Sequence, residues 1–364
     1  MSISKSVWLI SHVFILACIS YSNSSFSFPA NARRGYSNCQ TCHVSPTGGG
    51  VVTKYGKMTS EEFMSTWAYE GEASPTYGLF DLPLWLDIGG DVRQVEIKSE
   101  YEGLDPYQTK FIMQFDIEVA LHLTKRITLV TSGGRYGVDY KWERRRTYGL
   151  LKVTDGVKFR FGQFFPAYGI MIDDHTKLFR RALGFDQGRE SVNAEVSYNG
   201  RWGDLIVTRV FGNKPSFDSK DNGGLAVRNG DDDGGTIRAG KYFTKKFQLG
   251  LSYLKDRTRK SLGAYMIWGM GRSGHWLMQI DRLSRDDGEH IDLVFNRLGY
   301  EMFQGFHVKW EYQYQQSENS KTNVMGGAIQ WFPRPHWEFL VQQDLVKTDG
   351  NKITNSLVMV HYYF

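Results

Sequence analysis

The chain has 364 residues, a formal net charge of +5 and an aromatic content of 15%. Its basic residues are mixed with acidic ones, so the charge gives no support for a nucleic-acid partner. The composition, with 39 Gly beside 9 Pro, suits β-structure with many turns, and this length admits either two ordinary domains or one large barrel.

Residues 1–27 are predicted to be a secretory signal peptide. Lys5 lies in a short polar start, an apolar run extends from Val7 to Ile19, and cleavage is expected after Ser27. No later stretch approaches the roughly 18 consecutive apolar residues of a transmembrane helix, so membrane insertion would have to use strands. Alternatively, residues 15–18 form a lipoprotein processing site, which would make Cys18 the lipidated first residue.

Removal of Cys18 with the signal leaves only Cys39 and Cys42, which excludes a disulfide framework. Residues 39–43 read CQTCH, the C-x-x-C-H pattern of haem c attachment. Each thiol at this spacing can form a thioether with a haem vinyl group, and His43 then becomes an axial iron ligand. A zinc site would need a second Cys or His pair, and a redox pair would need a βαβ context. We therefore predict one covalent haem c in a segment spanning 28–80.

The second axial ligand is less well defined by the sequence. Met58 follows His43 by fifteen residues and is the predicted ligand, with Met64 as a neighbouring candidate. A methionine ligand would raise the reduction potential relative to a second histidine. There are two alternatives. The iron could have no second protein ligand, or a histidine from the later part of the chain could supply it. In either case both methionines would be packing residues.

Residues 28–65 resemble the haem segment of exported bacterial cytochromes that are fused to outer-membrane porins. The likeness rests on the CQTCH motif, on residues 28–38 before it, and on residues 44–50 and 55–56 after it. Only Cys39, Cys42 and His43 carry over from the family. The resemblance implies extracellular electron transfer or iron oxidation, with a periplasmic c-type cytochrome as one partner and an extracellular metal ion or solute as the other.

From about Asp81 onward, apolar and polar residues alternate in segments of about ten residues. These segments are about twice the usual strand length of a soluble sandwich and match tilted membrane strands. Aromatic residues near segment ends, including Trp276, Trp331 and Trp337, suit an interfacial girdle. We predict an all-β fold in which residues 81–364 form an outer-membrane antiparallel barrel surrounded by lipid; a soluble β-protein is the alternative.

About sixteen strands are predicted, an even number as in bacterial outer-membrane barrels. The connections alternate between short turns, assigned to the periplasmic side, and longer polar ones, including 166–191 and 213–234, assigned to the outside. The chain ends on Phe364 after an alternating strand, which resembles the assembly signal of outer-membrane barrels, and residues 160–169 resemble a segment of phosphate-selective porins. The candidate strands are 83–98, 108–123, 126–137, 144–153, 156–165, 192–200, 203–212, 235–243, 246–255, 261–270, 274–284, 290–300, 305–316, 322–332, 336–346 and 354–364.

The alternation also predicts five histidines that face the lumen at the periplasmic ends of strands. One of them could supply the distal haem ligand or bond a haem propionate; the simpler alternative is that they are solvated. Residues 231–233, all Asp, could bind Fe²⁺ or another hard cation, or form a flexible acidic loop. The five histidines are His122, His275, His307, His336 and His361.

Motifs of hydrolases and phosphate-binding loops are absent from the sequence, so the chemistry rests on the haem. The leading hypothesis is an electron carrier in which the barrel insulates a haem within or under its lumen. The second hypothesis is a diffusion porin for small solutes, with the haem segment as plug, sensor or docking point. A haem peroxidase is a third, and would need an open iron position and a distal acid–base residue.

Overall fold

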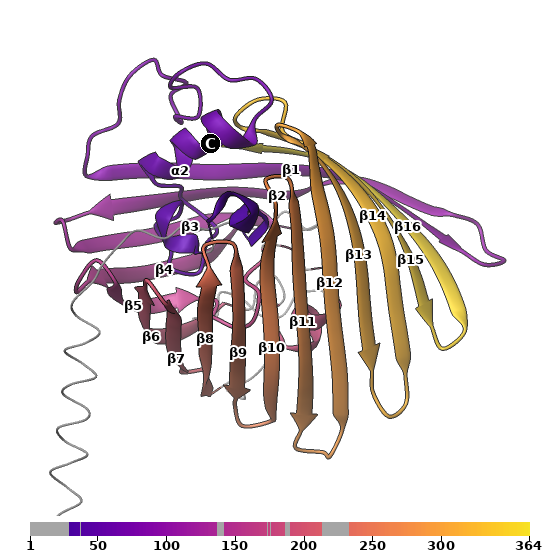
Figure 1. Ribbon diagram of the computed structural model, residues 1–364. Helices are drawn as coiled ribbons and strands as arrows, with labels where there is room; N and C mark the ends of the chain where they lie inside the picture. The colour runs from indigo at the N-terminus through magenta and orange to yellow at the C-terminus, as the bar shows by residue number, and fades with distance from the viewer. Residues whose placement is uncertain are drawn as a thin grey trace, which may run out of the picture.

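The computed structural model describes residues 29–36, 38–136, 142–172, 174, 176–185, 190–212 and 233–364. The predicted signal peptide, Cys18, Asp231 and Asp232 lie outside these residues. The described residues form a closed antiparallel β-barrel preceded by a segment of short helices (Figure 1). Among them, no helix is long and apolar enough to cross a membrane.

Sixteen strands make up the described barrel, and each pairs with its neighbours in sequence. Closure comes from pairing of the first strand with the last, with Asp91 opposite Tyr363 and Tyr101 opposite Ile353. In order, β1 to β16 span Leu86–Tyr101, Tyr107–His122, Ile127–Tyr136, Trp142–Lys152, Val157–Phe164, Ser191–Gly200, Gly203–Val210, Gly234–Thr244, Phe247–Lys255, Arg259–Met270, Gly274–Arg285, His290–Phe303, Phe306–Gln316, Lys321–Trp331, Trp337–Thr348 and Asn351–Tyr363.

The structure confirms the predicted barrel of sixteen strands. Each predicted strand matches one observed strand, and their ends differ by at most three residues, as at Leu86 and Phe303. The agreement follows from the strict period of two in a strand, because successive side chains point to opposite faces.

The two faces of the barrel have opposite chemical character. Many inward-facing side chains of the strands are polar or charged and buried, as for Glu118, Arg160 and Gln248. An apolar group on neighbouring strands, which includes Phe295, also faces inward. Outward-facing side chains are large, apolar and exposed, as for Leu251 and Val341. This reversal of the soluble arrangement is that of a barrel standing in lipid with a polar lumen.

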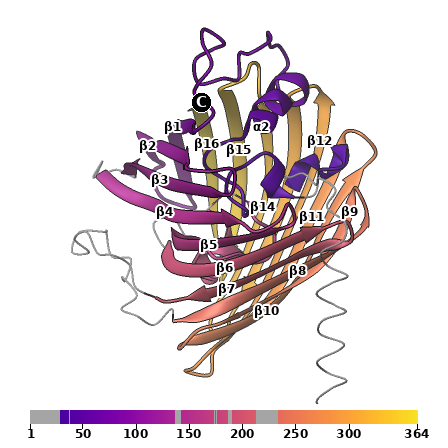
Figure 2. The same cartoon turned by 90° about the vertical axis from the view of Figure 1, so that its left-hand side faces the viewer.

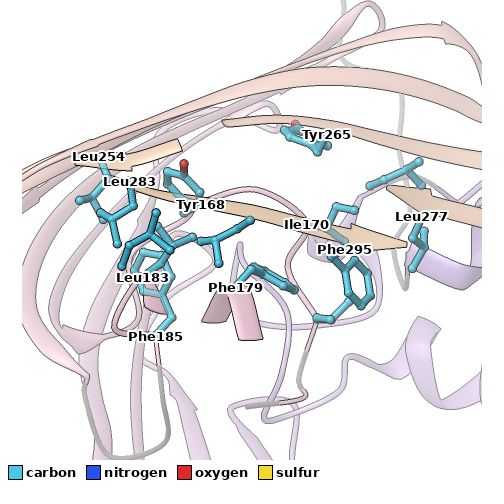
Figure 3. Packing of buried hydrophobic residues seen from close by; sticks show 14 of the residues in the cluster. Tyr168, Ile170, Phe179, Leu183, Phe185, Leu254, Tyr265, Leu277, Leu283 and Phe295 are labelled. Atoms are coloured by element: carbon cyan, nitrogen blue, oxygen red, sulfur yellow. The ribbon is translucent and has the colours of Figure 1, made fainter. Parts of the chain in front are cut away.

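The connection between β5 and β6 folds into the lumen instead of extending outward, which corrects the expected external loop over 166–191. Its short helix α3 (Leu178–Ala182) places Phe179 against Phe295 of β12, with ring centroids 5.2 Å apart. Strand side chains also bond its backbone: the Gly169 N–H donates to Ser252 at 2.8 Å. Figure 3 shows the apolar cluster that results. We call the described residues from 165 to 185 the inward segment.

Phe179→Ala is expected to detach the inward segment from the wall. Removal of a buried phenylalanine ring costs about 3–5 kcal/mol, so amide hydrogens of the inward segment should exchange faster with solvent, measured by mass spectrometry. Leu251→Ala removes an exposed, lipid-facing side chain and is the matched control. Equal exchange in the two variants would contradict the packing role of Phe179.

Candidate haem-binding site

The segment before the barrel, residues 29–80, lies at the end of the barrel that also holds the C-terminus (Figure 1). We call it the N-terminal segment and this end the C-terminal mouth. Its elements are η1 (Pro29–Arg34), η2 (Cys39–Thr41), α2 (Lys54–Thr59) and η3 (Ser60–Met64). In the view of Figure 2, part of the segment lies within the ring of strands.

The C-x-x-C-H motif folds into one tight turn, η2. Asn38 precedes the turn, and its side-chain oxygen accepts a hydrogen bond of 2.7 Å from the Gln40 N–H. The N–H groups of Cys42 and His43 both donate to the Cys39 carbonyl. Such a turn holds the two thiols close to each other. Both are buried, and neither forms a disulfide among the described residues.

The residues after the motif fold back against it. His43 pairs with Val52 in an isolated antiparallel bridge, and a turn of three glycines, residues 48–50, connects the two sides. A Cβ atom on Gly48 would lie 3.1 Å from Cys39 Sγ and 3.9 Å from His43 Cδ2, and its φ is +81°. Glycine at this position therefore permits close approach of the backbone to the C-x-x-C-H motif.

Charged side chains of the barrel wall bind this turn directly. The Val51 N–H donates to Glu118 Oε1 of β2 at 2.8 Å. On β5, Arg160 donates to Ser45 Oγ at 3.0 Å and is paired with Glu195 of β6 at 2.8 Å. Since Arg160 is only 1% exposed, the turn that follows the motif is fixed within the lumen.

A second anchor fastens the start of the N-terminal segment to β12. Arg33 and Arg34, at the end of η1, both bind Glu301, at 3.2 and 2.7 Å. In the turn between β14 and β15, Arg334 binds Glu72 at 2.7 Å. The N-terminal segment is thus held by the barrel at several points around the mouth.

A cavity of about 700 Å³ lies in the lumen between the N-terminal segment and the inward segment. Cys39, Cys42 and His43 all contribute to its lining. Its strand walls and the inward segment supply charges of both signs. The basic lining residues are Arg93, Arg146, Arg160, Arg180, Arg297 and Lys309, and the acidic ones are Asp91, Asp116, Glu118, Asp174, Glu311, Glu338 and Asp344.

Solved structures with the same architecture are outer-membrane proteins. A loop L8 deletion mutant of OmpT from Vibrio cholerae matches with a TM-score of 0.57 at 11% identity, over 77% of this chain and 99% of that one. The outer membrane channel DcaP of Acinetobacter baumannii gives 0.57 at 11%, over 78% and 99%. The anion-selective porin of Comamonas acidovorans gives 0.54 at 12%, over 77% and 99%. No protein-family model matches the chain, and neither does any curated protein.

The chain has the fold of an outer-membrane porin. At these identities the likeness concerns the architecture alone. What distinguishes this porin-type barrel is the N-terminal segment bound within its C-terminal mouth.

The structure brings three of the four predicted haem-binding residues to one cavity. Met58 on α2 is 47% exposed and does not line the cavity with Cys39, Cys42 and His43. Met64, the neighbouring candidate, does line it. Met58 belongs to α2 and Met64 to η3, so the two side chains point in different directions. Their spacing from His43 in the sequence does not indicate which of them faces the cavity.

Four of the five predicted lumen histidines have polar partners. His122 contacts Asp87 and Thr128, at 2.9 and 3.0 Å, and His361 contacts Glu338 at 2.7 Å. His336 lies in a turn, not in a strand, and both of its nitrogens meet backbone carbonyls. His307 lies 3.9 Å from Glu301. Of the five, only His275 and His361 line the cavity.

The residues around the cavity fit a covalently attached haem. Two thiols outside any described disulfide could form the thioether bonds that haem c requires, and the adjacent imidazole of His43 could ligate its iron. The basic lining residues suit two propionates. Burial, followed by the nearby Cys39, raises the pKa of the Cys42 thiol to about 11, so this thiol is protonated at neutral pH. By contrast, the described residues contain no group of three or more His, Cys, Asp or Glu side chains that could hold a metal ion.

The wall residues that anchor the site carry no distinguishing signal in the sequence. Glu118, Arg160 and Glu301 are charged residues at inward positions of strands, and a porin lumen has many of these. Asp233, the described member of the acidic run, pairs with Arg209 at 2.6 Å and with Arg257 at 3.2 Å. Its carboxylate is engaged within the protein.

Gly50→Ala is expected to loosen the turn after the motif. Gly50 has φ +63°, and a Cβ there would lie 2.0 Å from Glu118 Oε1. The left-handed backbone costs about 1–2 kcal/mol for alanine, and displacement of Glu118 would add about 1.5–3 kcal/mol through its lost hydrogen bond. Gly103→Ala is the control, because Gly103 has φ +79° with nothing within 4 Å. Equal losses of thermal stability in both variants would contradict the role of Glu118.

Proposed function

We propose that the chain is an outer-membrane electron carrier with one covalent haem c in the mouth of a porin-type barrel. Cys39 and Cys42 would hold the haem, and His43 would be one axial ligand. When bound, the haem supplies a one-electron couple. The protein binds and orients the haem, and the barrel crosses the membrane around it.

One observation carries this proposal: both thiols and His43 line a single lumen cavity. A tail that merely hung beneath the barrel would not need Glu118 and Arg160 inside the lumen to bind its backbone and side chains. Because the N-terminal segment is held in the mouth, a haem there would meet a periplasmic c-type cytochrome from one side. From the other side an extracellular metal ion, such as Fe²⁺, or another solute would reach it through the lumen.

The test is a difference spectrum of intact cells, recorded after addition of Fe²⁺ or of another reductant that does not cross membranes. Cells with the wild-type protein should show reduced haem bands, and cells with Cys39→Ala should show them weakly or not at all. Wild-type haem that an outside reductant cannot reduce would argue against the electron carrier.

The second candidate is a diffusion porin in which the N-terminal segment serves as plug, sensor or docking element. The porin fold favours it, and two of the matching structures are described as a channel and as an anion-selective porin. Planar bilayer recording separates the two functions. A diffusion porin should conduct small ions steadily whether or not haem is attached. An electron carrier needs no such steady conductance.

A further inference from the structure

His275 differs from every other lumen histidine named above. It is the second residue of β11, lies at the C-terminal mouth and lines the same cavity as Cys39, Cys42 and His43. Its side chain is 1% exposed, yet neither ring nitrogen has a hydrogen-bond partner among the described residues. Buried polar groups in native proteins are rarely left in this state, and such a group calls for an explanation.

Two glycines shape the surroundings of this imidazole. Within the sheet, Gly269 of β10 and Gly299 of β12 are the direct cross-strand partners of His275. A Cβ on Gly299 would lie 2.1 Å from the Cε1 atom of the ring, so the ring occupies the space over this glycine. A Cβ on Gly269 would lie 2.4 Å from the carbonyl carbon of Ala32. The N-terminal segment therefore docks on the wall immediately beside His275.

We propose that His275 is the second axial ligand of the haem iron, supplied by the barrel wall. This inference rests on the proposed haem function. A neutral imidazole with an uncommitted nitrogen is a common axial ligand of iron. Coordination would give the buried ring the partner that it lacks in the described part of the chain. It would also tie the haem of the N-terminal segment to the barrel by an iron–nitrogen bond.

The other candidates are already engaged or lie elsewhere. The Met64 sulfur accepts a hydrogen bond from the Asn31 amide at 3.8 Å. Both ring nitrogens of His361 have protein partners, Nδ1 at 2.7 Å from Glu338 and Nε2 at 3.5 Å from the Arg93 guanidinium. Met58 lies away from the cavity. His275 is the candidate for which the structure offers no competing contact among the described residues.

The experiment compares absorption and electron paramagnetic resonance spectra of the purified full-length protein with those of His275→Ala. We expect a low-spin, six-coordinate ferric haem in the wild type, without the sulfur-to-iron band of methionine ligation. His275→Ala should become high-spin and should bind carbon monoxide when reduced, and added imidazole should restore the low-spin spectrum. His122→Ala is the matched control, because His122 lies at the same mouth but away from the cavity.

Each outcome has a definite meaning. A wild-type spectrum with methionine ligation or high-spin iron would overturn the assignment without any variant, even if His275→Ala failed to fold. An unchanged spectrum in folded His275→Ala, or the same change produced by Met64→Leu, would also overturn it. A wild-type protein with no porphyrin absorbance would instead refute the proposed haem function, which keeps the two failures distinct.

Discussion

The variant Cys39→Ala/Cys42→Ala is expected to lose covalent haem completely while the barrel remains folded. Both proposed thioether bonds would depend on these thiols, whereas the strands of the barrel pair independently of them. Denatured wild-type protein should retain porphyrin absorbance and carry the additional mass of one haem. The double variant should show neither, yet its unboiled form should still migrate faster than its boiled form in gel electrophoresis.

The matched controls are the two single variants, Cys39→Ala and Cys42→Ala. Each keeps one thiol and should retain some covalent porphyrin at reduced yield. Covalent porphyrin in the double variant would show that the attachment site lies elsewhere. A double variant that failed to fold would show that haem attachment is needed to assemble the barrel, contrary to this expectation.

Glu301→Ala should release the start of the N-terminal segment from the wall. Arg33 is 1% exposed and Glu301 5% exposed, so removal of the carboxylate leaves a buried guanidinium without its charged partner. Removal of one partner of a buried ion pair lowers stability by about 3–5 kcal/mol. If trypsin acts through local opening, cleavage after Arg33 or Arg34 should accelerate about a hundredfold or more.

Asp292→Ala is the control for this measurement. Asp292 pairs with Arg282 at 2.7 Å, but both side chains are exposed to solvent, and such pairs contribute about 0–1 kcal/mol. Trypsin should therefore cleave the Asp292 variant at nearly the wild-type rate. Similar rates for the two variants would mean that Glu301 does not anchor the segment.

Alternation made the barrel predictable in unusual detail. In the stretch 115–123, apolar residues at every second position face outward, and Asp116 and Glu118 are buried on the inner side. A register shift between β1 and β2 interrupts the alternation just before this stretch, so Ile112 is exposed and Met113 lines the cavity. Lipid on one side and a polar lumen on the other favour this alternation along the strands, so local sequence predicts the global fold.

The inward segment has no such local pattern in its sequence. Residues 166–191 have no period-two pattern, and their polarity resembles that of any external loop. Phe179 and Leu183 are buried because β12 and neighbouring strands place apolar residues such as Phe295 against them. That surface exists only once the barrel has closed.

The proposed haem site likewise has features that the sequence predicts and features that only the structure shows. The spacing of CQTCH by itself indicates haem attachment, since the chemistry needs only two thiols and a histidine along five residues. Which methionine faces the cavity, and which histidine lacks a partner, depends on contacts between distant parts of the chain. Met64 and His275 are 211 residues apart in sequence, yet both line one cavity.

The sequence alone determined the class of fold and the number of strands, and it predicted a haem-binding motif, because each is encoded by spacing within a few neighbouring residues. Only the tertiary structure decided that the N-terminal segment is bound within the mouth, that the loop after β5 turns inward, and that His275 is buried with no hydrogen-bond partner among the described residues. These features depend on side chains from non-adjacent strands that meet only in the closed barrel, and no local pattern records such meetings.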